Sequence, residues 1–312
     1  MSRIDRREFL GASLAAALVP AEPSKVVIAR DESLPIGDSA RVLKLLDRAI
    51  QTFFARDTPA EAWKLIARPG ECVGLKVNCL AGRGASTRTV LVDAVVERLQ
   101  QAGVRGSDIV IWDRLNSDLD SAGFPVGARR DKVRFIGNDS AGFEDDLAVF
   151  GNAGSLLSRT LTRQCQAVIN LPVLKDHGIV GVTMALKNMF GAIHNPNKYH
   201  LNAGDPYVAD VNALPPVRQK VRLTICDALV AQYEGGPSYM PQWSWPFNGL
   251  LVASDPVALD TVGWQIIEAK RREQGFKTLV AVKRAPNYIA TAADAQHRLG
   301  TNDARFIRRV EV

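Results

Sequence analysis

Residues 171–200 concentrate the side chains that can bind charge and move protons. This segment reads LPVLKDHGIVGVTMALKNMFGAIHNPNKYH and holds three of the four histidines of the chain, with three lysines among mostly apolar residues. A buried ammonium group must reach water with its tip or find a partner, because an unpaired buried charge costs several kcal/mol. The segment therefore predicts a site for an anion or a cofactor.

The histidines and lysines of this segment suggest two kinds of chemistry. His177 follows Lys175 at the end of a predicted strand, and we predict that His177 and Lys187 are catalytic. His194 and His200 could ligate a divalent metal together with a carboxylate, since neutral imidazole suits zinc, nickel or iron. A turn rich in proline and asparagine, without a metal, explains these two histidines equally well.

The elements that must position these residues alternate between strands and helices. Such alternation predicts one α/β domain over residues 22–312, Rossmann-like, with a mostly parallel sheet and helices on both faces. Ligands of such sheets bind at the carboxyl ends of the strands. We expect strands at 25–29, 72–80, 108–112, 132–136, 167–171, 221–226 and 250–253, and helices at 39–55, after 58, at 89–102, 156–163, 255–274 and 288–299.

Charged residues follow several of these strands and are predicted to bind a ligand. They are Arg88, in a basic glycine-bearing loop that leads into a helix, and Asp113, Lys175, Asp227 and Glu234. A helix N-terminus with an arginine nearby suits a phosphate or a carboxylate. The loop lacks the glycine patterns of nucleotide sites, so the sequence does not specify a nucleotide.

Four motifs resemble, in order, those of the family called domain of unknown function 362. They are VGLKVN, VINLPVLKDHGIVGVTMALKNMFGAI, YEGGP and LLVASDPVALDTVG, and the similarity covers roughly residues 70–300. The resemblance implies an α/β domain of unsettled role, some of whose members carry iron–sulfur ferredoxin segments that this chain lacks. It implies site roles for Lys76, Asn78, Lys175, His177, Lys187, Asn188, Lys198, His200, Asp227, Glu234 and Asp260.

A second region is similar to the nickel-pincer lactate racemases. His177 and Lys187 have the ten-residue separation of that family's catalytic histidine and cofactor-anchoring lysine, and His200 follows as a nickel ligand would. The resemblance implies that His177 is a base, that Lys187 anchors the cofactor and that Arg88 binds the substrate carboxylate. The chain departs from the family at residues 112–114, where Trp-Asp-Arg replaces the second catalytic histidine.

The composition indicates a soluble globular protein whose partner is a small anion. The chain has 312 residues, of which 46% are hydrophobic and 23% are charged, and a net charge of +6. The basic residues are interleaved with acidic ones and do not form the aromatic and basic patches typical of nucleic-acid binding, so we do not expect a nucleic-acid partner.

The first 21 residues read as a twin-arginine-type signal peptide. Arg6 and Arg7 precede an apolar run at 10–19, and Ala21 ends a small-residue cleavage site. We therefore expect the export machinery as a partner, a mature protein that begins near Glu22 and a periplasmic location. No other segment has the roughly 20 apolar residues that a membrane span needs.

The cysteines of the chain do not identify a cofactor. They are Cys72, Cys79, Cys165 and Cys226. An even number of cysteines allows two disulfides, but small buried side chains are the favoured interpretation, and the close spacing of an iron–sulfur site is absent. A transition metal, held as in nickel-pincer enzymes or as an iron–sulfur centre, stays open. The leading hypothesis is an exported α/β protein with a cationic pocket of histidine and lysine, a cofactor- or metal-dependent enzyme that acts on a small anionic substrate. The alternatives are an iron–sulfur or other metal redox protein that transfers electrons and a non-catalytic periplasmic binding protein.

Overall fold

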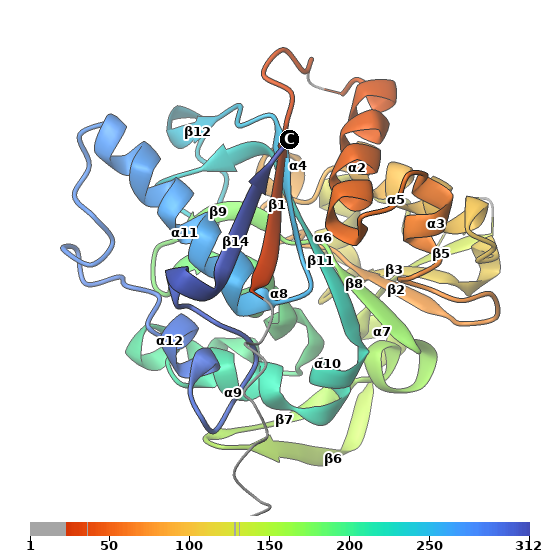
Figure 1. Cartoon of the computed structure of the whole chain (residues 1–312). Helices are drawn as coiled ribbons and strands as arrows, with labels where there is room; N and C mark the ends of the chain where they lie inside the picture. The colour runs from red at the N-terminus through yellow and green to blue at the C-terminus, as the bar shows by residue number, and fades with distance from the viewer. Residues whose placement is uncertain (1–22, 36, 128, 131) are drawn as a thin grey trace, which may run out of the picture.

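The computed structural model describes residues 23–312 except 36, 128 and 131 (Figure 1). The expected signal peptide at 1–21 lies outside this range. The strands are β1 (Ser24–Arg30), β2 (Val73–Lys76), β3 (Ile109–Asp113), β4 (Arg129–Arg130), β5 (Val133–Gly137), β6 (Phe143–Phe150), β7 (Ala153–Ser158), β8 (Ala167–Asn170), β9 (Val173–His177), β10 (Gly181–Thr183), β11 (Val221–Gln232), β12 (Ser244–Trp245), β13 (Gly249–Ala253) and β14 (Ile307–Glu311).

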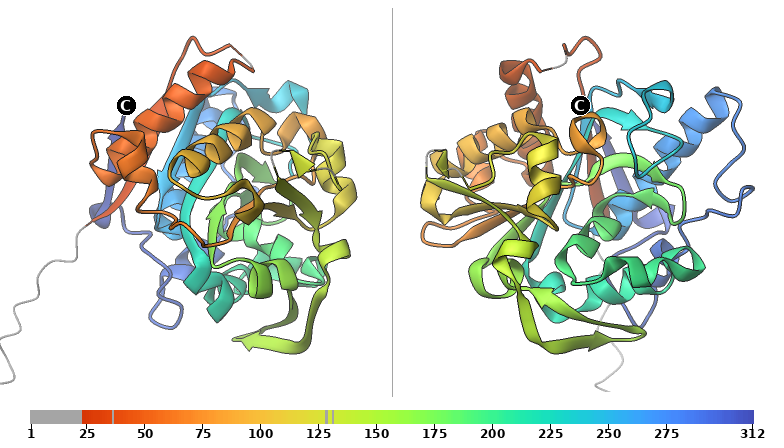
Figure 2. Two further views of the ribbon diagram at one scale, coloured as in Figure 1. Left: turned by 90° about the vertical axis from the view of Figure 1, so that its right-hand side faces the viewer. Right: turned by 180° about the vertical axis from the view of Figure 1, so that it is seen from behind.

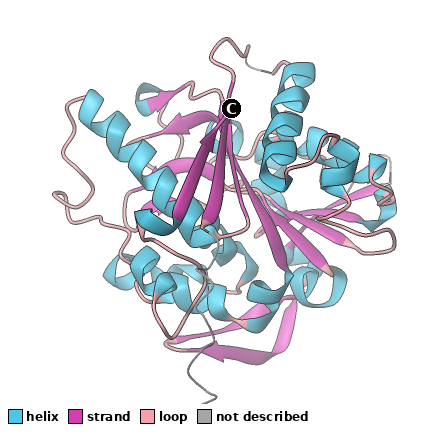
Figure 3. Cartoon of the chain, viewed as in Figure 1, coloured by secondary structure: helices cyan, strands magenta, loops and turns pink. Residues whose placement is uncertain are grey.

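The helices are placed between these strands (Figure 3). The α-helices are α2 (Ser39–Phe54), α3 (Pro59–Trp63), α4 (Gly82–Ala85), α5 (Thr89–Gln101), α6 (Asn116–Ala122), α7 (Asn138–Ala141), α8 (Ala185–Asn188), α9 (Tyr207–Ala213), α10 (Pro215–Lys220), α11 (Pro256–Glu273) and α12 (Tyr288–Ala293). The 3-10 helices are η1 (Gly106–Asp108), η3 (Met189–Ala192), η4 (Pro196–Gly204), η5 (Pro241–Trp243) and η6 (Ala304–Phe306), and η2 (Thr160–Gln164) is a π-helix.

The central sheet is mostly parallel, which confirms the predicted fold class. Among the described residues its strands lie in the order β14-β1-β13-β11-β8-β2-β3-β5-β4. The run from β11 through β8, β2 and β3 to β5 is parallel throughout. Strand β13 runs antiparallel to both neighbours, β1 and β11. Long connections between parallel neighbours carry the covering helices, as parallel pairing requires.

Successive residues of the strands enter two separate apolar cores, one on each face of the sheet. In β3, Ile109 and Ile111 pack into the core that includes residues of α2, α3 and α5, whereas Val110 and Trp112 pack into the core that includes α8, α9 and α11. This alternation is expected because neighbouring side chains of a strand point to opposite faces. Figure 2 shows helices on both sides of the sheet.

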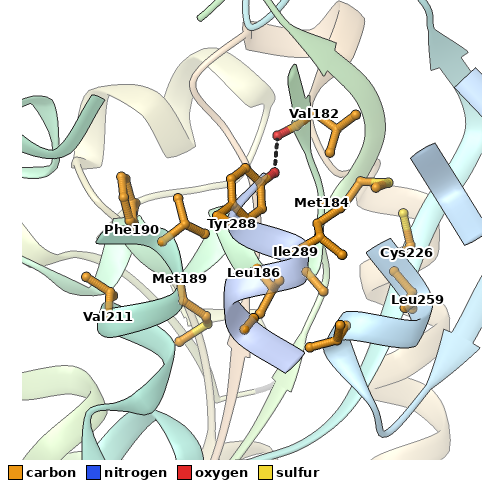
Figure 4. Close-up of a cluster of buried hydrophobic side chains, with 14 of the residues drawn as sticks. Val182, Met184, Leu186, Met189, Phe190, Val211, Cys226, Leu259, Tyr288 and Ile289 are labelled. Atoms are coloured by element: carbon orange, nitrogen blue, oxygen red, sulfur yellow. Dashed lines mark hydrogen bonds between the residues drawn. The ribbon is translucent and has the colours of Figure 1, made fainter. Parts of the chain in front are cut away.

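The core that includes α8, α9 and α11 packs directly against residues 180–193. Leu186 and Met189 lie among Leu259 and Ile289, and the Tyr288 hydroxyl donates a hydrogen bond of 2.9 Å to the carbonyl of Val182 (Figure 4). The apolar positions of residues 180–193 therefore anchor this segment, while its polar positions remain available for a site.

Three predicted helix starts have the capping contacts that their sequences suggest. Asp38 and Thr58 cap α2 and α3, and the Asp255 carboxylate accepts a 2.8 Å hydrogen bond from the backbone N–H of Ala258 in α11. Such bonds satisfy N–H groups that have no partner within the helix.

Four predicted elements differ from the structure in type or in length. Strand β2 (Val73–Lys76) is shorter than the strand predicted at 72–80, and β11 (Val221–Gln232) is longer than the strand predicted at 221–226. The helix expected at 156–163 is wrong, because β6 and β7 form a separate two-stranded sheet there and only the short η2 follows. The helix expected at 288–299 ends at Ala293. In β7 alternating burial and pairing with β6 outweigh the helical propensity of the leucines, as tertiary context often does.

Candidate functional site

A cavity of about 360 Å³ lies at the carboxyl ends of β2 and β3. Residues of β9, β10, α8, η3 and η4 complete its wall. It is lined by Lys76, Asn78, Leu80, Asp113, Arg114, Asp118, Lys175, His177, Ile179, Thr183, Lys187, Asn188, Phe190, Gly191, Pro196, Asn197, His200 and Pro237. Eight of the predicted site residues are in this set: Lys76, Asn78, Asp113, Lys175, His177, Lys187, Asn188 and His200.

One wall of the cavity is a fully hydrogen-bonded ion pair. The ammonium of Lys76, at the end of β2, donates to Asp113 at 2.7 Å, to the carbonyl of Val77 at 2.6 Å and to Asn188 at 3.3 Å. The second carboxylate oxygen of Asp113 accepts from the backbone N–H of Cys79 at 2.7 Å. A buried ion pair needs such additional hydrogen bonds to offset the loss of hydration.

Gly191 allows this pair to approach the backbone of η3. A Cβ atom there would lie 2.6 Å from Lys76 Cε and 2.8 Å from Asp113 Oδ1. The glycine of the NMFG motif is therefore required by the space that the ion pair occupies.

Two other lysines have no carboxylate within ion-pair distance among the described residues. Lys175 is fully buried and donates to the carbonyl of Ala85 at 2.7 Å. Lys187 is 9% exposed; its ammonium lies 4.1 Å from the centre of the Phe190 ring and makes no hydrogen bond to any described residue. Burial lowers the pKa of Lys175 to about 8 and that of Lys187, which is also repelled by Lys76, to about 7.

The His177 ring is held in a neutral state. Its Nδ1 accepts hydrogen bonds from the backbone N–H groups of Ile179 and Val180, at 3.1 and 3.3 Å. Burial, followed by repulsion from Lys187, lowers the pKa of His177 to about 2. An acceptor at Nδ1 assigns the proton of the neutral ring to Nε2. His200 lies alongside, with 5.5 Å between ring centres, and burial also lowers its pKa.

The charges around the cavity do not balance. Two carboxylates, Asp113 and Asp118, face the four cationic groups of Lys76, Arg114, Lys175 and Lys187. Arg114 is paired with Asp118 at 3.2 Å. After both pairs are counted, the positive groups of Lys175 and Lys187 remain, and the potential in the cavity favours an anion.

Two polar atoms in the wall also lack partners. Thr183 Oγ1 and Asn78 Oδ1 are buried without a hydrogen bond. Buried polar atoms are nearly always bonded, so such exceptions at a cavity indicate where a ligand or water would bind.

The remaining predicted site residues lie away from the cavity. Asp227 accepts a hydrogen bond of 2.8 Å from the backbone N–H of Arg88, so these two residues contact each other and not the cavity. Burial raises the pKa of Asp227. Lys198 is exposed and lies over the Tyr199 ring.

Asp260 and Glu234 have structural partners. The Asp260 carboxylate accepts from the backbone N–H groups of Ala185 and Leu186, at 2.7 and 3.0 Å, at the start of α8. Burial raises the pKa of Asp260 to about 8. Glu234 pairs with Arg271 and Arg284. Burial acts to raise the pKa of Glu234, but hydrogen bonds from both arginines outweigh it and lower the pKa.

The two predicted metal ligands do not share a site. His194 packs edge-on against Phe143 and lines a different cavity from His200. Among residues 23–312, as far as the structure describes them, no three His, Cys, Asp or Glu side chains are grouped so that they could hold a metal ion. This donor set does not fit a metal ion held by protein side chains alone.

Sequence reasoning missed several residues of the wall. Arg114 and Asp118 follow Asp113 at the end of β3, and their place after a strand was a usable signal. Thr183 and Phe190 carried no such signal, since β-branched and aromatic residues in an apolar segment read as core.

A mostly parallel sheet covered by helices defines the class of protein, an α/β protein, and a cationic cavity lies where its parallel strands end. Within that class, the chain belongs to the family described as Domain of unknown function (DUF362), whose model matches residues 73–265. The first of the two sequence resemblances is thereby confirmed.

Proteins similar to this chain include a sequence relative and a solved structure. The Thylakoid-associated protein sll1697 of Synechocystis sp. (strain ATCC 27184 / PCC 6803 / Kazusa) is 28% identical over 251 residues, which cover 75% of this chain and 70% of the relative. A crystal structure of a Thermotoga maritima protein from the Northeast Structural Genomics Consortium matches 69% of this chain with 10% identity and a TM-score of 0.41. This chain spans 58% of the length of that protein.

No helix within the described residues is both long and apolar enough to cross a membrane.

Proposed function

We propose that this protein is an enzyme that binds a small organic anion in the cavity and uses Lys187 as its reactive amine. The observation that carries the proposal is the ammonium of Lys187, which is buried and has no ion-pair or hydrogen-bond partner among the described residues, in a cavity with an excess of positive groups. A volume of about 360 Å³ suits a small molecule and not a polymer.

Lys187 has two useful states near neutral pH. Its pKa of about 7 gives both charged and neutral amine at pH 7. The charged amine attracts an anion, and the neutral amine accepts a proton or attacks an electrophilic carbon. Phe190, beneath the amine, keeps its surroundings apolar, so that the amine gains more from an anion than it would in water.

His177 acts as a hydrogen-bond donor in this proposal. Because Nδ1 is occupied by two backbone N–H groups, the neutral ring has its N–H at Nε2. The base role expected for His177 then passes to Lys187, while His177 orients the substrate. Thr183 Oγ1 can donate a further hydrogen bond to the anion, and Asn78 Oδ1 can accept one from a hydroxyl or amine group of the substrate.

Binding of defined anions tests this proposal. Acetate, pyruvate, malonate, succinate and phosphate are titrated by calorimetry into the wild type and into Lys187→Met, with acetamide as the uncharged comparison. A matched control is Lys220→Met, since Lys220 is also partly buried but donates to the carbonyls of Leu161 and Thr162, outside the cavity. We expect at least one of the carboxylates to bind the wild type and the control with similar affinity. The same carboxylate should bind Lys187→Met at least tenfold more weakly.

The same titrations separate the alternatives. If no anion binds, or Lys187→Met binds as well as the wild type, the anion site is refuted. Tight binding without turnover of any bound anion would favour a periplasmic binding protein. Visible absorbance of protein from its native host would favour the metal redox alternative, because iron–sulfur and nickel–thiolate centres are coloured.

We also propose that the chain is exported through the twin-arginine route to the periplasm. The support is the sequence of residues 1–21, with Arg6 and Arg7 before an apolar run. Replacing both arginines by lysine should retain the uncleaved chain in the cytoplasm of the native host. Cleaved periplasmic protein from that double variant would contradict this route.

A further inference from the structure

Two cysteines lie against each other at the end of the sheet opposite the cavity. Cys72 immediately precedes β2 and Cys165 shortly precedes β8, and the two thiols are close enough that each is the first cause of the shifted pKa of the other. The backbone N–H of Gln166 donates to the carbonyl of Cys72 at 2.9 Å, which fixes the register of the two segments. This pairing places Cys72 opposite Gln166, so Cys165 is its diagonal neighbour. With strands about 4.8 Å apart and a rise of about 3.3 Å per residue, the diagonal Cα separation is roughly 5.8 Å, within the range of about 4.4–6.8 Å that disulfides span.

The surroundings make the two thiols unequal. Cys72 is partly exposed, and its sulfur accepts a hydrogen bond of 3.7 Å from Arg134 Nη2. The hydrogen bond from Cys165 and the charge of Arg134 lower the pKa of Cys72 to about 7, against burial and the opposing carboxylate of Asp108. Cys165 is 1% exposed, and its pKa is raised well above the ordinary value by its bond to Cys72 and by burial, although Lys220 and Arg134 oppose this.

The side chain of Cys165 occupies space that Gly74 leaves free. A Cβ atom at Gly74 would lie 2.5 Å from Cys165 Sγ. The buried thiol of Cys165 therefore has a defined position beside β2, next to the partly exposed thiol of Cys72.

We propose that Cys72 and Cys165 form a thiol-modification site that reacts with low-molecular-weight disulfides and closes into an intramolecular disulfide. In the first step the Cys72 thiolate attacks one sulfur of the small disulfide, so that a mixed disulfide forms and one small thiolate leaves. In the second step the Cys165 thiol loses its proton and attacks the Cys72 sulfur, and the second small thiolate leaves. Two protein thiols are oxidised and one small disulfide is reduced to two thiols.

The other two cysteines provide internal comparisons. Cys79 and Cys226 are 0% exposed, and burial raises the pKa of each well above its ordinary value. Iodoacetamide at pH 7 should therefore modify Cys72 about tenfold faster than either of them, because only the thiolate reacts.

Oxidised glutathione is the probe that tests the proposal. Reduced wild-type protein is incubated with it, quenched with acid and mapped by mass spectrometry without reduction. We expect the loss of two thiols and a linked peptide pair containing Cys72 and Cys165. The variant Cys165→Ser should stop at a glutathione adduct on Cys72, Cys72→Ser should form no adduct, and Cys226→Ala should still form the linked pair.

Two results would overturn the proposal. One is a wild type that keeps all its thiols, or links other cysteines, after incubation with oxidised glutathione. The other is a Cys72 that reacts with iodoacetamide no faster than Cys79. Both results come from the unmodified sequence, so they do not depend on whether a cysteine variant folds.

Discussion

Anion binding should weaken as the pH rises from 6 to 9, because Lys187 loses its charge within this range. With a pKa of about 7, Lys187 is roughly 90% protonated at pH 6 and about 1% protonated at pH 9. The pKa of Lys175 is about 8, so its charge is lost later in the same range.

The size of the effect follows from one charge-assisted hydrogen bond. Such a bond contributes about 1.5–3 kcal/mol, which corresponds to an affinity change of roughly 10- to 100-fold. We therefore expect the dissociation constant of the best carboxylate to rise by one to two orders of magnitude between pH 6 and 9. No separate transition is expected near pH 6.5, because the low pKa of His177 keeps its ring neutral.

Calorimetry in buffers of different ionisation enthalpy measures this directly. Binding should take up protons most strongly between pH 7 and 8.5, and Lys187→Met should remove most of that uptake. Lys220→Met serves as the control for the loss of a lysine elsewhere. A dissociation constant that is constant from pH 6 to 9, or an equal pH dependence in Lys187→Met, would refute the assignment of this charge.

Four further predictions concern the stability of the site, each measured by urea unfolding monitored by circular dichroism. Asp113→Asn leaves the ammonium of Lys76 buried without its counter-charge and should lower the unfolding free energy by about 3–5 kcal/mol. Asp260→Ala removes the acceptor of two backbone N–H groups of α8. It should lower the unfolding free energy by about 1–3 kcal/mol for each N–H group left unpaired. Gly191→Ala should destabilise the fold and weaken anion binding, because its Cβ atom displaces the Lys76 ammonium. Without an anion, the wild type should become more stable as the pH rises from about 7 to 10.5, and Lys187→Met should show less of this rise.

The sign of the last prediction follows from proton counting. The folded pKa of Lys187 lies below its ordinary value of 10.5, so the unfolded chain binds more protons between the two values and stability increases with pH there. The prediction would be contradicted if the stability of the wild type fell between about pH 7 and 10.5 and Lys187→Met showed the same pH dependence. If the unfolding free energy of Asp113→Asn or Asp260→Ala equals that of the wild type, the bonds of that carboxylate make no net contribution to stability. If Gly191→Ala binds the anion as tightly as the wild type, the ion pair of Lys76 and Asp113 moves to make room for the added Cβ atom.

The sheet was predictable because its strands carry local signals. The apolar runs around Val73, Ile109 and Val168, each followed by polar or glycine-bearing loops, indicate buried parallel strands, and Asp255 before Pro256 indicates a helix start. The hairpin formed by β6 and β7 was not predictable, since its exposed strand includes Leu147 and Val149 and its partner resembles a short helix.

The candidate site divides in the same way. Asp113, directly at a strand end, was placed at the cavity by the rule for parallel sheets, whereas Lys76 was predicted from the family resemblance. Asp260 and Glu234 share the polar and charged character of binding residues, and only tertiary contacts show that they bind the backbone of α8 and two arginines. Similarly, no sequence pattern indicates that Cys72 and Cys165, 93 residues apart, lie in contact.

The bond between Asp260 and the start of α8 has a consequence for any transfer of this pocket to another scaffold. Helix α8 has only four residues and carries both Lys187 and Asn188, yet its first two N–H groups are bound by a carboxylate from α11. A graft of residues 171–200 alone would leave those groups without an acceptor and the amine without a fixed position. The position of Lys187 therefore depends on two distant segments, and any transferable unit must include the first two turns of α11, which carry Asp260.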